Sequence, residues 1–234
     1  RQALANALWH ARHRRTFQKT LIDQPLMRAV LADMAIESEA ATALVFRLAQ
    51  SFDAAAVSPM DAQFMRIATP IGKYWLNKRV VNFVYEAMEA HGGAGYVEES
   101  VMPRLFRQSP LNSIWEGSGN VICLDVLRAM MREPESAVAY LDEIEAARGA
   151  DRKLDAAIDA LKDRLVQPPP ESDARHLVEQ MALALQASLL VRHAPPAIAD
   201  GFCATRLAVP GATYGASGQK LNETAILARV LPMA

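Results

Sequence analysis

The chain has 234 residues, of which 51% are hydrophobic and 22% are charged, with 11 glycines and 13 prolines. This composition is typical of a globular protein with one or two domains, and it excludes disordered, collagen-like and low-complexity chains. Two cysteines, Cys123 and Cys203, are too few for a disulfide scaffold and favour a reducing, cytoplasmic location. No apolar run reaches the roughly 18 residues of a membrane span, so no membrane association is expected.

Charge is unevenly distributed, although the formal net charge is only -1. Residues 1–28 carry six basic side chains and one acidic one, giving +5, whereas residues 133–234 carry ten basic and fourteen acidic side chains, giving -4. A basic segment can face phosphates, but an acidic one is a poor surface for nucleic acid. On charge alone, an ordinary solvated surface is the favoured interpretation of both segments.

The spacing of apolar residues predicts long helices in the first part of the chain. Ser58 is a predicted N-cap with Pro59 at the first helical position, and the pair Gly92-Gly93 suits a helix end. The first residues already show a helical pattern without an initiator Met, so we expect a fragment of a longer chain. The predicted helices cover residues 1–19, 25–53 and 59–91.

Residues 94–117 are predicted to form a loop with one short helix at 103–107, and a longer helix follows over 118–133. No segment alternates like a strand, so the predicted fold class is all-α. The pattern changes at Pro134, which places a domain boundary between residues 1–133 and residues 134–234. Prolines separate the shorter helices predicted beyond it, at residues 135–148, 151–166, 172–193, 197–208 and 217–230.

Two glycine-rich segments do not match nucleotide-binding motifs. Residues 92–95 follow a helix instead of a strand, and Glu98 stands where a dinucleotide motif requires its third glycine. Residues 215–220 lack the spacing of a phosphate-binding loop. His10 and His13 share a helix face, but arginines surround them and no acidic ligand is close in sequence. We therefore expect no metal site.

Residues 112–120 combine features of a catalytic site. Glu116 lies between Trp115 and Gly117, just before a predicted helix. A neighbouring indole can partly desolvate a carboxylate and so make it a stronger general base. Glycines allow backbone N–H groups to approach a ligand, and a helix start favours an anion. Taken alone, the pattern favours the simpler interpretation, a structural glutamate near a helix N-terminus.

Three elements resemble those of the acyl-CoA dehydrogenase family, in the same order and at matching distances. Residues 115–118, Trp-Glu-Gly-Ser, are similar to the family's aromatic-Glu-Gly-Thr/Ser segment. Arg14-x-x-Phe17 with Gln24 resembles its Arg-x-x-Phe-Gly…Gln element, and residues 87–96 resemble its Gln-x-x-Gly-Gly-x-Gly-Tyr element. The resemblance covers residues 1 to about 132 and implies the family's C-terminal four-helix bundle.

Within the family, the sequence is most similar to the AidB-like branch of adaptive-response flavoproteins linked to alkylation damage. Three segments resemble that branch nearly letter for letter, at residues 86–89, 112–120 and 123–128. The branch carries an additional helical domain after the dehydrogenase part. Residues 134–234 resemble this smaller C-terminal helical domain.

The resemblance implies FAD as cofactor, an acyl-CoA thioester as substrate, and Glu116 as the base that removes its α-proton while the β-hydride passes to the flavin. It also implies a homodimer or homotetramer in which subunits share FAD. Implied contacts to the FAD of a neighbouring subunit come from Arg14, Phe17, Gln24, Gly92, Gly93 and Gly95. Implied contacts to the subunit's own FAD come from Ser118 and Asn120.

The sequence departs from the family pattern at three positions. Gln18 replaces a glycine, Glu89 replaces a glutamine, and Gln108 stands where an Asp is usual. Glu89 would repel a pyrophosphate and so opposes that contact. We expect the 234-residue fragment to be inactive by itself, because the family's upstream domains complete the flavin and acyl pocket.

Two other functions compete with the dehydrogenase interpretation. One is a DNA-associated flavoprotein of the alkylation-damage response with vestigial dehydrogenase activity, and the other is a structural oligomerisation domain. DNA binding by residues 134–234 would need clustered cations, but acidic residues interleave with the basic ones of residues 151–164, so we expect it to be weak and salt-labile. The candidate cations are Arg148, Arg152, Lys153, Lys162 and Arg164.

Overall fold

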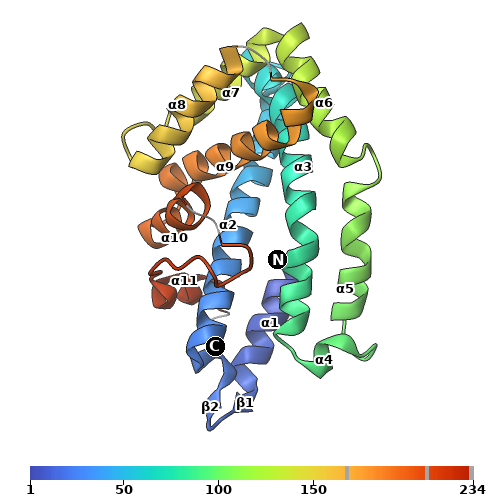
Figure 1. Cartoon of the computed structure of the whole chain (residues 1–234), viewed down its shortest axis with the longest axis vertical. Coiled ribbons are helices and arrows are strands. Elements are labelled where there is room, and N and C mark those ends of the chain that lie inside the picture. The colour runs from blue at the N-terminus through green and yellow to red at the C-terminus, as the bar shows by residue number, and fades with distance from the viewer. Residues whose placement is uncertain (167–168, 209–210, 232–234) are drawn as a thin grey trace.

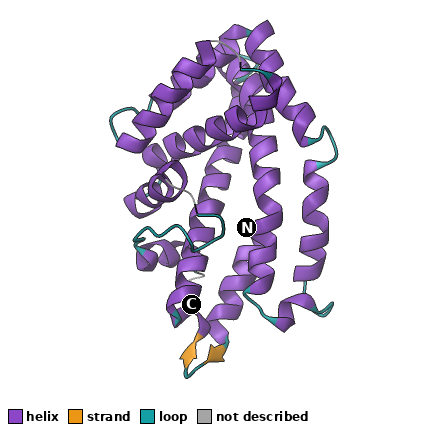
Figure 2. Cartoon of the chain, viewed as in Figure 1, coloured by secondary structure: helices purple, strands orange, loops and turns teal. Residues whose placement is uncertain are grey.

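A computed structural model describes residues 1–166, 169–208 and 211–231, and this part of the chain is almost entirely helical (Figures 1 and 2). The all-α prediction is confirmed. The first half contains α1 (Gln2–His13), η1 (Leu21–Asp23), α2 (Pro25–Ala54), α3 (Pro59–Glu89), α4 (Gly93–Tyr96), α5 (Met102–Gln108), η2 (Ser109–Ser113) and α6 (Gly119–Arg132). The second half contains α7 (Pro134–Glu145), α8 (Arg152–Val166), η3 (Glu171–Asp173), α9 (Ala174–His193), α10 (Pro196–Phe202), the π-helical η4 (Cys203–Ala208) and α11 (Glu223–Val230).

The long helices α2 and α3 run side by side in opposite directions and form the centre of the molecule (Figure 1). As predicted, Ser58 caps α3: its hydroxyl accepts a hydrogen bond from the backbone N–H of Asp61 at 3.2 Å, and Pro59 occupies the first turn. The short helix within residues 94–117 and the helix that begins at Gly119 also agree with the sequence analysis. None of the described helices is long and apolar enough to cross a bilayer.

The prediction that the first helix reaches Lys19 is wrong. Helix α1 ends at His13, and β1 (Arg15–Thr16) pairs antiparallel with β2 (Lys19–Thr20) in a small hairpin. Phe17 and Gln18 form its turn with φ angles of 48° and 68°. Phe17 continues the apolar spacing of the first helix, but its ring is 91% exposed at the tip of the hairpin. The last helix is also shorter than predicted, because Asn222 caps it and it begins at Glu223.

The second half of the chain packs directly on α2 and α3. Helix α7 lies against α3, α9 lies against both long helices, and α11 lies against α2. Buried apolar side chains from residues 3 to 227 form one continuous core. A buried hydrogen bond of 2.9 Å from the indole N–H of Trp75 to the side-chain oxygen of Gln186 also joins α3 to α9.

A buried ionic network joins the two halves. The guanidinium of Arg206, in η4, donates to Asp33 at 2.6 Å and to Glu37 at 3.0 Å, and Arg79 of α3 donates to Glu37 at 2.9 Å. Tyr214 accepts a further bond from Arg79 at 3.3 Å. Burial alone raises the pKa of Glu37, but the two arginines outweigh it and hold that pKa below its usual value.

Breaking this network is expected to destabilise the chain strongly. Arg206→Met should lower the free energy of unfolding by about 3–5 kcal/mol, because Asp33 and Glu37 stay buried without their shared partner. Urea unfolding at pH 7 measures the change. The matched control is Arg152→Met, an exposed arginine, with an expected change below about 0.5 kcal/mol.

The same variant has an expected pH signature. A carboxyl whose pKa is lowered by folding stabilises the native state above its unfolded pKa of about 4.3 and loses that contribution as the pH falls through the folded value. The difference in stability between wild type and Arg206→Met should therefore shrink as the pH falls below about 4. A difference that is constant from pH 7 to pH 3 would contradict the role of Arg206 in holding Glu37 ionised.

Candidate functional site

The hairpin after α1 carries three of the predicted site residues. Phe17 projects from its tip, and Gln24 supports it by donating from its side-chain amide to the carbonyl oxygen of Thr16 at 3.0 Å. The backbone of Arg14 is fixed, since its carbonyl accepts from the N–H of Leu21 at 2.7 Å. Its guanidinium is exposed and forms no ion pair with a described residue, so its charge is available to a ligand.

The predicted glycines lie at the same end of the molecule, with Gly92 just before α4 and Gly93 and Gly95 within it (Figure 1). The rings of His10 and His91 are 4.8 Å apart and join the end of α1 to this turn. Gly92 has φ 61°, and nothing lies within 4 Å of the position that a Cβ would take at Gly92 or Gly93. At Gly95 a Cβ would lie 2.2 Å from the carbonyl oxygen of Met88, so packing alone requires that glycine.

Glu116 lies elsewhere, in the turn between η2 and α6. It has φ 55°, and Gly117 follows with φ 99°. The ammonium group of Lys73, on α3, donates to the carbonyl oxygen of Trp115 at 2.8 Å and also to that of Glu116. One helical turn later, Asn77 donates to the carbonyl oxygen of Asn112 at 2.7 Å. Helix α3 therefore holds this turn through backbone oxygens, and the Glu116 side chain points into solvent.

The shielding that the sequence suggested for Glu116 is not present within the described chain. Glu116 is exposed, and Trp115 is 55% exposed beside it. A desolvated carboxylate at this position therefore requires cover from another segment or another molecule.

The two predicted residues at the start of α6 differ in their environment. Ser118 occupies the N-cap position, but its side chain makes no capping hydrogen bond and is exposed. Asn120 accepts a hydrogen bond at 2.8 Å from Arg175, in the first turn of α9. Lys73, Asn77 and Arg175 were not predicted as site residues. Their partners are 35 to 55 positions away in sequence, and no local pattern marks them.

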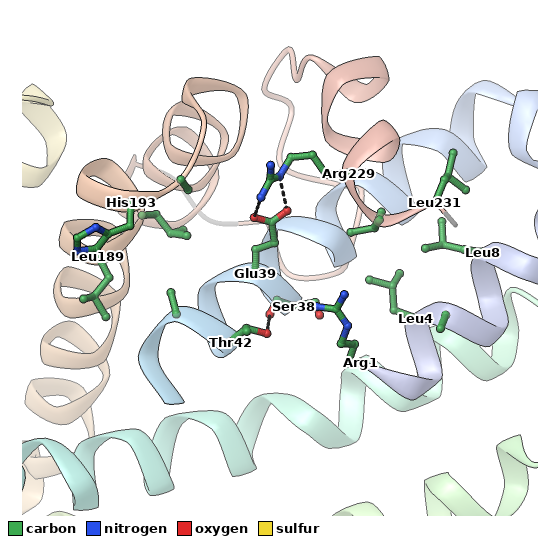
Figure 3. Close-up of a pocket in the computed structure, with 15 residues that line it drawn as sticks. Arg1, Leu4, Leu8, Ser38, Glu39, Thr42, Leu189, His193, Arg229 and Leu231 are labelled. Atoms are coloured by element: carbon green, nitrogen blue, oxygen red, sulfur yellow. Dashed lines mark hydrogen bonds and ion pairs between the residues drawn. The ribbon is translucent and has the colours of Figure 1, made fainter. Parts of the chain in front are cut away.

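A cavity of about 620 Å³ lies between α1, α2, α9 and α11 (Figure 3). Leu4, Leu8 and Leu189 face it from two sides, and an ion pair between Arg229 and Glu39 with an N–O distance of 2.7 Å closes one edge. None of the predicted site residues lines it. No group of three or more potential metal ligands occurs among the described residues.

Most of the candidate DNA-binding cations already have acidic partners. Arg148 pairs with Glu145 and Asp159, Lys162 pairs with Glu145, and Arg164 pairs with Asp173. Each of these pairs reduces the positive potential that phosphates would need. Weak, salt-labile association with DNA stays a prediction, and the structure adds no support for a tighter interaction.

Comparison with known proteins identifies the family. The sequence profile of the acyl-CoA dehydrogenase C-terminal domain matches residues 1–131. The chain belongs to the acyl-CoA dehydrogenase family. It is 41% identical over 223 residues to the putative acyl-CoA dehydrogenase AidB of Escherichia coli K12, covering 95% of this chain and 40% of that protein. The resemblance to the AidB-like branch is therefore confirmed, and the chain spans less than half of this relative.

Two solved structures extend the comparison. Caenorhabditis elegans ACDH-11 in complex with C11-CoA is 26% identical, with a TM-score of 0.74 over 86% of this chain and 38% of that one. An acyl-CoA dehydrogenase from Bacillus anthracis complexed with FAD has a TM-score of 0.65 over 88% of this chain and 44% of that one. At 16% identity, the second likeness shows the shared fold alone.

The hairpin turn makes one departure from the acyl-CoA dehydrogenase pattern energetically unfavourable. Gln18, which replaces the family's glycine, has φ 68°, a conformation that costs an L-residue about 1–2 kcal/mol. Gln18→Gly should therefore stabilise the chain by about 0.5–1 kcal/mol after the extra backbone entropy of glycine is subtracted. Thermal unfolding measures this difference. Gln18→Ala keeps the strained backbone and should leave stability unchanged, so stabilisation by alanine would argue against backbone strain.

Proposed function

We propose that the chain is the C-terminal helical part of an FAD-dependent flavoprotein that dehydrogenates an acyl-CoA thioester between its α and β carbons. The observation that carries the proposal is Glu116, an exposed carboxylate on a backbone turn that α3 holds in place, within a segment matched by the family profile. The complex of ACDH-11 with C11-CoA supports a thioester as the substrate class.

The described residues fit contacts to FAD. The guanidinium of Arg14 is exposed and has no acidic partner among the described residues, so it can bind a pyrophosphate. The open space at Gly92 and Gly93 lets a ligand reach the backbone. Phe17 offers an exposed ring beside them. Glu89 is exposed near the same turn, and its charge opposes an anion there. When bound, FAD supplies the acceptor for the hydride that leaves the β-carbon.

The residues of the Glu116 turn then have defined roles. The carboxylate of Glu116 takes the α-proton, and its backbone N–H, which has no acceptor among the described residues, donates to the thioester oxygen. This hydrogen bond stabilises the negative charge that develops on that oxygen as the proton leaves. Ser118 and Asn120 follow at the start of α6, where they can contact the cofactor of the same subunit.

The distance between the two groups of residues supports cofactor sharing in a homodimer or homotetramer. From Lys73, beside the Glu116 turn, to Glu89, next to the glycine turn, α3 extends about 24 Å. The two groups can therefore face two different cofactors, one bound to the same subunit and one to a neighbour. The exposed ring of Phe17 is suited to burial in such an interface.

We also propose that the chain has two helical parts and is located in the cytoplasm. The family profile ends at residue 131, which supports a boundary at about residue 133 between the dehydrogenase part, 1–133, and an additional helical part, 134–234. Their shared core makes them one packed unit in this chain.

Cys123 and Cys203 are buried free thiols, which favours a cytoplasmic location for the protein.

The role of Glu116 can be tested in the whole protein that contains this chain. Glu116→Gln should leave flavin content unchanged and slow acyl-CoA-driven flavin reduction by about 10²- to 10⁴-fold, because the amide cannot accept the α-proton. Anaerobic absorbance spectroscopy follows the bleaching of the flavin. Glu99→Gln, a change at another exposed glutamate, serves as the matched control. Near-normal reduction by Glu116→Gln would assign the base to another residue.

The oligomeric state gives an independent test. The whole protein should sediment as a dimer or tetramer at micromolar concentration, and Phe17→Ser should weaken that association and lower flavin content. Val166→Ser, at an apolar residue that is 80% exposed on α8, is the control and should change neither. A flavin-loaded monomer would rule out cofactor sharing between subunits.

A further inference from the structure

Two side chains on one face of α3 hold the backbone of the Glu116 turn. Lys73 and Asn77, four residues apart, donate only to main-chain carbonyls: Lys73 to those of Trp115 and Glu116, and Asn77 to that of Asn112. No carboxylate pairs with Lys73 in the described part of the chain. An ammonium group that contacts two successive peptide oxygens restrains the direction of both carbonyl groups.

The orientation of these peptides decides where the Glu116 N–H points. The carbonyl of Trp115 and the N–H of Glu116 belong to the same peptide group, and no cis peptide occurs in the described chain. In a planar trans peptide the C=O and N–H bonds point in opposite directions. Because Lys73 binds the carbonyl on the α3 side, the N–H must point away from α3. That is the N–H for which the described chain provides no acceptor.

The ammonium charge also strengthens this donor. A cation on the carbonyl oxygen of an amide polarises the whole group, so the N–H at its other end becomes a better hydrogen-bond donor. Glu116 and Gly117 both have positive φ angles, 55° and 99°, and a non-glycine residue in this region persists only where its surroundings hold it. Without Lys73, the turn loses two of the contacts that oppose its relaxation.

We propose that Lys73 is a positioning residue for the dehydrogenation: through the Trp115–Glu116 peptide it directs and strengthens the N–H that binds the thioester oxygen. This inference rests on the proposed function. Lys73 does not touch the substrate and moves no proton. It acts by setting the direction and polarity of a donor that belongs to another residue, and it holds the backbone from which the Glu116 carboxylate projects.

The test compares Lys73→Met, which removes the charge and the donors, with Lys73→Arg, which retains both, in the whole protein. Lys220→Met, at an exposed lysine far along the chain, is the matched control. In Lys73→Met, flavin reduction at saturating acyl-CoA should fall about 100-fold, the cost typical of a displaced catalytic geometry. Flavin content should stay unchanged, and Lys73→Arg should restore most of the rate.

A second readout does not depend on turnover. In the non-reacting Glu116→Gln background, the backbone N–H remains, so the infrared stretch of a ¹³C-labelled thioester carbonyl should shift to lower frequency on binding. Adding Lys73→Met should return it towards the value of free acyl-CoA, and adding Lys73→Arg should not. Amide hydrogen exchange of residues 113–118 in the ligand-free protein should also become faster in Lys73→Met.

The outcomes separate this inference from the proposed function. If the wild type reduces its flavin with acyl-CoA but Lys73→Met retains both the rate and the carbonyl shift, Lys73 has no positioning role. If the wild type shows no acyl-CoA-driven reduction, the proposed function fails, and the positioning role fails with it even where exchange becomes faster. Loss of rate, loss of the shift and recovery with arginine together support the inference.

Discussion

The packing of the second half of the chain depends on the buried guanidinium of Arg206. A buried charge is tolerated only with partners of opposite sign, and Asp33 and Glu37 provide them one turn apart on α2. Arg79 of α3 shares Glu37, so the network also fixes the two long helices relative to each other. The loop after η4 joins it, since the backbone N–H of Gly215 donates to Asp33 at 2.8 Å.

The two long helices, α2 and α3, support both groups of candidate site residues. The glycine turn and the hairpin lie at one end of α3, and the Glu116 turn is held from near its middle by Lys73 and Asn77. The fold thus holds the backbone of these segments in place, whereas the side chains of Arg14, Phe17 and Glu116 remain exposed. The surfaces that would cover Phe17, Trp115 and Glu116 are not provided by the described chain.

The sequence was sufficient to predict features with a local physical cause. Apolar periodicity predicted α2 and α3, and the Ser58-Pro59 pair marked the start of α3 correctly. The hairpin was missed because Phe17 continues the apolar spacing of α1, while the positive φ angles that bend the chain there belong to residues other than glycine. In the acyl-CoA dehydrogenase family a glycine at the position of Gln18 indicates this turn. The glutamine in this chain gives no such indication.

The contacts that shape the candidate site could not be predicted in the same way. In the sequence, Lys73 cannot be distinguished from other charged residues of a long helix, because its acceptors lie 42 and 43 positions further along the chain. The left-handed backbone of Glu116 is likewise unfavourable by local preference, and the contact with Lys73 helps to hold it. The motif around Glu116 located the turn, whereas its geometry depends on how α3 packs against the segment before α6.

The hydrogen bond between Arg175 and Asn120 restricts what the start of α6 can recognise. A guanidinium has only donors, so it must be bound to the side-chain oxygen of Asn120, and the amide cannot rotate to exchange its two ends without losing that bond. The NH₂ group is then the end that Asn120 can present to a ligand. Arg175 lies in α9, outside the part of the chain that the dehydrogenase profile matches. Through its bond to Asn120, it favours ligand groups that accept a hydrogen bond over those that donate one.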